Sequence, residues 1–114
     1  MRWLVGLFLV LSPRVALAYH DDWTGPDKVQ HFAVAGALAA GTYGVVAIAD
    51  EDLQTRLLAG LLVAGGAALG KEAIDAAGNG DPSFRDLAWD GAGIATGLLT
   101  AFAFDMLVQW ISEP

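Results

Sequence analysis

The sequence predicts an all-α fold: a small antiparallel bundle of three membrane-embedded helices that follows an N-terminal signal peptide. The chain has 114 residues, of which 55% are hydrophobic, and long runs of Ala, Gly, Leu and Val contain almost no charge. Charged residues gather in short clusters at the ends of these runs. The runs are apolar nearly all round, whereas each helix of a soluble bundle needs a wide polar face.

Residues 1–18 have the features of a secretory signal peptide. Arg2 provides the positive start, residues 3–11 are apolar, and residues 16–18 supply a small-x-small cleavage site. Cleavage there leaves a single helical membrane domain, residues 19–114. Arg14 is unusual so close to a cleavage site, so an uncleaved anchor stays open as an alternative.

The first two helices are expected at about residues 27–49 and 53–77. Thr24 and the proline that follows two positions later are typical of a helix start. Residues 32–49 carry no charge and span roughly 27 Å at about 1.5 Å per residue, which suits a bilayer. An acidic group ends this run and can begin the second helix; it comprises Asp50, Glu51 and Asp52.

The third helix is expected at about residues 83–111, after a turn-forming segment at residues 78–82. Either Asp81, or Ser83 with Asp86 three residues later, would cap it. Small residues recur at four-residue spacing on all three helices, which favours close helix packing in a membrane. They are Gly36, Ala40, Gly44, Gly66, Gly70, Gly93 and Gly97.

Connectivity brings the polar clusters to one end of such a bundle, because short loops make successive helices antiparallel. Asp27 and His31 share a helix face, and so do Asp86 and Asp90. Asp90 lies two turns into its helix, where a carboxylate needs a partner. We expect His31 to be that partner, with Glu72 reaching in from the second helix. The surrounding polar residues are Asp27, Lys28, Lys71, Asp75, Asp81, Arg85 and Asp86.

Two interpretations of this cluster are open. In the structural one, caps and ion pairs hold the helix ends together. In the functional one, His31, Glu72 and Asp90 form an acid/base site or a divalent metal site, with Asp86 or Asp75 as an added oxygen ligand. One His with carboxylates suits Mg²⁺, Mn²⁺ or a mixed-ligand Zn²⁺ site, but no tight metal-binding spacing is present. Asp105 stands apart and is expected to face the opposite aqueous side.

Composition excludes several classes of function. Thirteen acidic residues against six basic ones, with no basic stripe, argue against a nucleic-acid partner. The absence of Cys excludes disulfides, thiolate metal sites and Cys nucleophiles. No serine-hydrolase elbow or phosphate-binding loop is present either. We therefore favour a non-enzymatic structural or partner-binding protein, with membrane lipid and either a second copy or another envelope protein as partners. A membrane-embedded enzyme or metal-binding protein that uses His31, Glu72 and Asp90 on a lipid-linked or envelope substrate stays open as the alternative.

The order of motifs resembles that of YfiM-type lipoproteins, which are small bacterial envelope proteins of undefined activity. D-K-x-x-H-F, G-K-E-x-x-D and D-L-x-x-D-x-x-G occur in sequence within residues 23–98. There is a looser similarity to VanZ-like membrane proteins. The residues that carry the resemblance are Asp27, Lys28, His31, Phe32, Gly70, Lys71, Glu72, Asp75, Asp86, Leu87, Asp90 and Gly93.

This resemblance implies a bacterial envelope protein and names no substrate. A lipoprotein carries an acylated Cys, and this chain has none, so the helices themselves would have to anchor it. We expect the inner membrane, with the polar cluster facing the periplasm because the N-terminus is exported.

Overall fold

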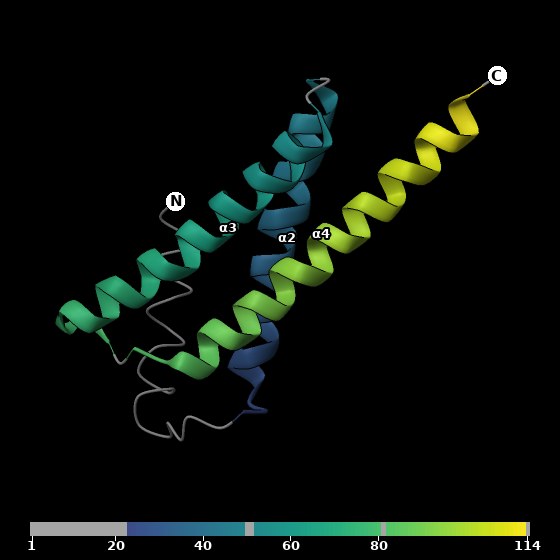
Figure 1. The fold of residues 1–114 in the computed structure, drawn as a ribbon. Helices are drawn as coiled ribbons and strands as arrows, with labels where there is room; N and C mark the ends of the chain where they lie inside the picture. The colour runs from purple at the N-terminus through teal and green to yellow at the C-terminus, as the bar shows by residue number, and fades with distance from the viewer. Residues whose placement is uncertain (1–22, 50–51, 81, 114) are drawn as a thin grey trace, which may run out of the picture.

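The fold is all-helical in the part of the chain that the computed structural model describes, which is residues 23–49, 52–80 and 82–113. Three long helices follow one another (Figure 1), namely α2 (Pro26–Ile48), α3 (Leu53–Ile74) and α4 (Phe84–Ser112). A short π-helix, η1 (Asp75–Asn79), extends α3. The prediction of three helices is thereby confirmed. The expected signal peptide lies outside the described residues.

The starts of α2 and α3 follow from local hydrogen bonding. Gly25, and not the expected Thr24, is the N-cap residue of α2, and it has no side chain with which to cap the helix. Asp52 caps α3 by accepting a hydrogen bond from the backbone N–H of Thr55 at 2.8 Å. This hydrogen bond lowers the pKa of Asp52.

The connection between α3 and α4 differs slightly from the expectation. The α-helical part of α3 ends at Ile74 and widens into η1, where Gly78 adopts a left-handed conformation with φ of 108°. Ser83 caps α4 as predicted, because its hydroxyl accepts a hydrogen bond from the backbone N–H of Asp86 at 3.1 Å. Asp81, the other candidate cap, lies outside the described residues.

Helix α2 is the centre of the bundle and lies between α3 and α4 (Figure 1). It packs most extensively against α4 and less against α3, while α3 and α4 contact each other least. The small hydrophobic core consists of Ala35, Ala39, Ala64 and Ile94, with Leu98 packed beside it. Such small side chains hold the helix backbones close together.

Glycine allows the closest approach, between α2 and α4. A Cβ atom on Gly93 would overlap the carbonyl oxygen of Phe32, and one on Gly97 would overlap that of Gly36. The predicted packing of small residues is therefore confirmed for Gly36, Gly93 and Gly97. Within the bundle, Gly44, Gly66 and Gly70 make no such approach, because a Cβ atom there would meet nothing within 4 Å.

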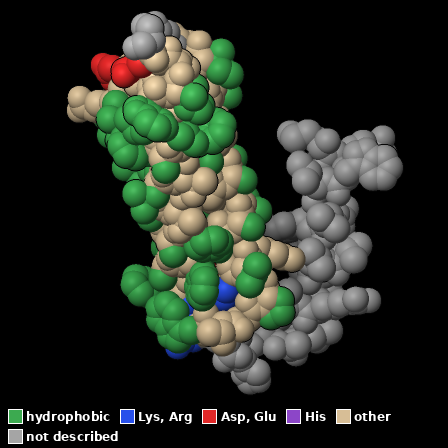
Figure 2. Space-filling view, turned by 90° about the vertical axis from the view of Figure 1, so that its right-hand side faces the viewer, with side chains coloured by type: hydrophobic (Ala, Val, Ile, Leu, Met, Phe, Trp, Pro, Cys, Tyr) green, Lys and Arg blue, Asp and Glu red, His purple; other side chains and the backbone are tan. Residues whose placement is uncertain are grey.

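The outer surface of the bundle is largely apolar. Each of the three helices is long and apolar enough to cross a membrane, and only 17% of its most apolar 18-residue window is buried within the bundle. On the face shown in Figure 2, hydrophobic and uncharged groups fill the middle, and acidic and basic side chains lie toward the two ends. Large apolar side chains exposed along the helices include Val34, Val45, Leu62, Leu69, Leu99 and Phe104.

Candidate functional site

The polar cluster forms where the first turns of α2 meet those of α4. Asp27 and His31 are four residues apart on α2, so they lie on one face of that helix. Asp86 and Asp90 have the same spacing on α4. Because α2 packs against α4 along this end, the two faces oppose each other, and the predicted convergence is observed.

Lys28 is the buried cation of the cluster, and its side chain is only 1% exposed. Its Nζ atom lies 2.5 Å from Oδ1 of Asp86 and 3.0 Å from Oδ2 of Asp27. Charge-assisted hydrogen bonds of this kind are stronger than neutral ones, and removing Lys28 would deprive the buried carboxylate of Asp86 of its shortest ion pair. Sequence analysis placed Lys28 only in the surrounding ring; the structure places it at the α2–α4 contact.

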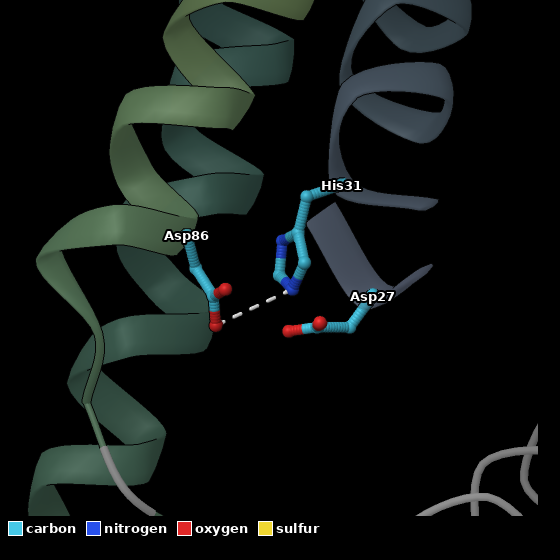
Figure 3. A group of neighbouring side chains, drawn as sticks. All are labelled: Asp27, His31 and Asp86. Carbon is cyan, nitrogen blue, oxygen red and sulfur yellow. Dashed lines mark ion pairs between the residues drawn. The ribbon is translucent and has the colours of Figure 1, made fainter. Parts of the chain in front are cut away.

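His31 bridges the two carboxylates of α4. Its Nδ1 atom lies 3.0 Å from Oδ1 of Asp90, and its Nε2 atom lies 3.4 Å from Oδ2 of Asp86. Figure 3 shows the imidazole of His31 pointing from α2 into the space beside Asp86, with Asp27 on the same side. The expected pairing of His31 with Asp90 is therefore observed, with Asp86 as an additional neighbour.

Asp90 is buried, and its two oxygens have different environments. Oδ1 contacts His31, whereas Oδ2 has no hydrogen-bond partner among the described residues. A buried carboxylate oxygen without a donor is destabilising, so native structures rarely contain one without a reason.

Helix α3 contributes to this end in a different way from the one expected. Glu72 is buried, but it accepts a hydrogen bond from the backbone N–H of Ser83 at 2.6 Å. Its carboxylate therefore fixes the start of α4, and no described interaction joins it to His31. The expected contact of Glu72 with His31 and Asp90 is not among the described interactions. Lys71 lies 3.1 Å from Asp75, 3.5 Å from Glu72 and 3.8 Å from Asp86.

Arg85 lies on the outer side of the cluster. Its guanidinium is 5.4 Å from the ring centre of Trp23, a cation–π arrangement. The indole N–H of Trp89 donates to the backbone carbonyl of Trp23 at 2.6 Å, and Trp89 packs edge-to-face on Phe32. These aromatic contacts hold the segment before α2 against α4. They were not predicted from the sequence.

Three residues bring potential metal-ligand atoms together. One ligand atom each from Asp27, His31 and Asp86 lies within 4.8 Å of the others (Figure 3). The predicted metal set was His31, Glu72, Asp86 and Asp90. Of these four residues, His31 and Asp86 belong to the group of neighbouring ligand atoms, and Asp27 is its third member. Asp90 contacts the opposite nitrogen of the same imidazole.

A second polar cluster lies toward the other end of the bundle. Asp105 of α4 accepts hydrogen bonds from the hydroxyl of Tyr43 at 2.5 Å and from the guanidinium of Arg56 at 2.6 Å. Tyr43 is buried, so Asp105 does not simply face water as expected. The sequence contained an indication of the Asp105–Arg56 ion pair. An acidic residue inside an apolar run needs a partner, and Arg56 is the basic residue at that end of the bundle.

Comparison of the chain with protein-family models, with curated proteins and with solved structures finds no match.

Proposed function

We propose that this chain is a small, non-enzymatic membrane protein of the bacterial cell envelope, in which three helices cross the bilayer and carry a polar cluster at one end. The observation that carries the proposal is the apolar outer surface of all three helices. In water this surface would be an aggregation liability, whereas lipid covers it without loss. The paired polar groups then lie near one interface, where they join the helix ends.

The favoured orientation places the polar cluster in the periplasm and the helices in the inner membrane. The predicted signal peptide supports this, because export of the N-terminus takes the start of α2 with it. The positive-inside rule argues the other way, since Lys28, Lys71 and Arg85 would lie outside. The ion pairs of both lysines with neighbouring acids weaken that objection.

Partner binding is the second part of the proposal. Gly66 and Gly70 lie one turn apart on α3, and the space beside each is open. Small residues at this spacing let another helix approach closely in a membrane. A second copy of the chain, or another envelope protein, is the proposed occupant of this face.

The alternative is an enzyme or metal protein that uses His31, Glu72 and Asp90 as one site. The contact of His31 with Asp90 is the geometry of a base oriented by a carboxylate. Glu72 accepts a hydrogen bond from the backbone N–H of Ser83, and no described contact joins it to His31 or Asp90. A structural and partner-binding module therefore agrees better with the geometry. An unchanged envelope phenotype in a folded His31→Ala variant would exclude the alternative.

Membrane fractionation and cysteine labelling test the proposal directly, since the chain has no Cys of its own. Carbonate-washed membranes should retain the protein; release into the wash would contradict membrane embedding. Ala77→Cys lies at the polar end and Gln54→Cys at the other, and both positions are exposed. A membrane-impermeant maleimide should label Ala77→Cys in intact spheroplasts and Gln54→Cys only after lysis. The reverse pattern would overturn the orientation.

Cross-linking tests the partner-binding part. A Gly66→Cys variant should form a specific cross-linked species in native membranes. Gly91→Cys is the matched control, because the space beside Gly91 is equally open but the residue lies on α4. Equal cross-linking of the two variants, or none at all, would contradict a specific contact through α3.

A further inference from the structure

We propose that Asp27, His31 and Asp86 bind one divalent transition-metal ion, with Asp90 orienting the imidazole of His31. The site lies at the α2–α4 contact and goes beyond the proposed membrane function, on which it does not depend. It is supported by the direction in which His31 points, by the local charge and by the positions of the oxygen atoms.

The hydrogen bond to Asp90 determines which nitrogen of His31 is available. Nδ1 is 3.0 Å from the carboxylate, which accepts and cannot donate when ionised, so we assign the proton to Nδ1. In the neutral ring, Nε2 then carries a lone pair. That lone pair faces Oδ2 of Asp86 at 3.4 Å, an unfavourable contact unless a positive charge lies between them. Metal-binding histidines usually have this arrangement, with the second nitrogen donating to a carboxylate.

Local charge also favours a cation. Three carboxylates surround His31, those of Asp27, Asp86 and Asp90. The ammonium group of Lys28 contacts the first two, and that of Lys71 lies 3.8 Å from Oδ2 of Asp86. Because Lys71 also pairs with Glu72 and Asp75, these described carboxylates still outnumber the two ammonium groups when His31 is neutral. Oδ2 of Asp90 belongs to the same group and has no hydrogen-bond partner among the described residues, which is unusual for a buried carboxylate oxygen. A divalent ion would balance this charge.

Lys28 and His31 face different oxygen atoms of Asp86. Lys28 contacts Oδ1, while Oδ2 lies 3.4 Å from Nε2 of His31 and 3.8 Å from the Nζ atom of Lys71. Zinc–ligand bonds of about 2.0–2.2 Å place neighbouring ligand atoms about 3.4 Å apart in a tetrahedral site. The three ligand atoms here lie within 4.8 Å of one another, so a small inward movement completes the site. Asp27 can supply it, since its side chain is 28% exposed and the least confined of the three.

The donor set identifies the class of ion. Imidazole nitrogen with carboxylate oxygens suits Zn²⁺, Mn²⁺ or Fe²⁺, whereas Mg²⁺ and Ca²⁺ prefer oxygen ligands alone. Zn²⁺ is the probe ion, and Co²⁺ is its spectroscopic substitute. Water is expected to complete the coordination, because three protein ligands leave one tetrahedral position.

Metal titration of the full-length protein in detergent tests the site. After chelator treatment, the protein should bind one equivalent of Zn²⁺ by calorimetry and elemental analysis, and Co²⁺ should give the visible absorption of nitrogen–oxygen ligation. His31→Gln, Asp27→Asn and Asp86→Asn should abolish this site. Asp90→Asn should weaken the affinity by about 10–100-fold, as expected for an orienting carboxylate.

Asp52→Asn is the matched control, because it removes one carboxylate at the opposite end and Asn keeps the helix cap. Its Zn²⁺ affinity should equal that of the parent chain. Helix content measured by circular dichroism identifies any variant that fails to fold. If Asp86→Asn fails to fold, Asp27→Asn still tests the site, because the side chain of Asp27 is partly exposed. The absence of stoichiometric binding would overturn the proposal, as would equal affinity in Asp27→Asn and Asp52→Asn. Neither result would affect the fractionation test.

Discussion

Gly60→Ala is expected to weaken the packing of α3 on α2, and the structure sets the size of the effect. A Cβ atom at this position would lie 2.7 Å from the carbonyl oxygen of Ala39 and 2.7 Å from Cδ2 of Leu98. A normal C···O contact is about 3.3 Å or longer, so the backbones must separate by roughly 0.6 Å. A gap of this size forfeits a quarter to a half of each van der Waals contact nearby.

The expected cost of this overpacking is about 1–3 kcal/mol. Gly65→Ala on the same helix is the matched control, because a Cβ atom at Gly65 meets nothing within 4 Å. Both variants gain the higher helix propensity of Ala, worth up to about 1 kcal/mol. This gain is the same for both variants, so the difference between their free energies of unfolding reports the steric contact alone.

The measurement is reversible unfolding in mixed micelles by titration with a denaturing detergent, followed by circular dichroism. We expect Gly60→Ala to unfold at a lower detergent fraction than Gly65→Ala. Equal unfolding midpoints for the two variants would refute the argument, because they would mean that α3 does not approach α2 at Gly60.

The same unfolding assay checks three further predictions. Lys28→Met should destabilise by about 3–5 kcal/mol because Asp86 loses its buried cation, and adding Asp86→Asn should recover part of this loss. Tyr43→Phe should cost about 1–2 kcal/mol through the lost hydrogen bond to Asp105, and no change would mean that the bond does not form. Ser83→Ala should cost about 1 kcal/mol as a lost helix cap, which Ser83→Asn should largely preserve.

The sequence allowed the helices and their polar end to be predicted because both depend on local pattern and connectivity. Four-residue spacing placed Asp27 with His31 and Asp86 with Asp90, and short loops brought the two pairs to the same end. The rotation of each helix about its axis was not predictable in this way. Helices that are apolar nearly all round carry no stripe that indicates which side faces a neighbour.

That missing information explains the main errors. Gly66 and Gly70 have the spacing of a packing face, but α3 turns Gly60 and Ala64 toward the bundle instead. Glu72 was expected beside His31, yet the rotation of α3 directs it to the backbone of Ser83. In each case the residue type indicated the kind of contact correctly. Which neighbour it contacts depends on the rotation of α3 about its axis, which is known only from the folded structure.

The two polar clusters together explain why α2 and α4 adopt a single alignment. Lys28 pairs with Asp86, 58 residues later in the chain, and Tyr43 pairs with Asp105, 62 residues later. The glycines between these pairs also resist sliding, because a slide by one turn would bring a residue with a Cβ atom to the closest approach at Gly93 or Gly97. A slide by one turn would break both pairs and leave ionised groups in an apolar environment, at a cost of several kcal/mol. The polar pairs therefore fix the alignment, and glycine lets the backbones come close enough for those pairs to form.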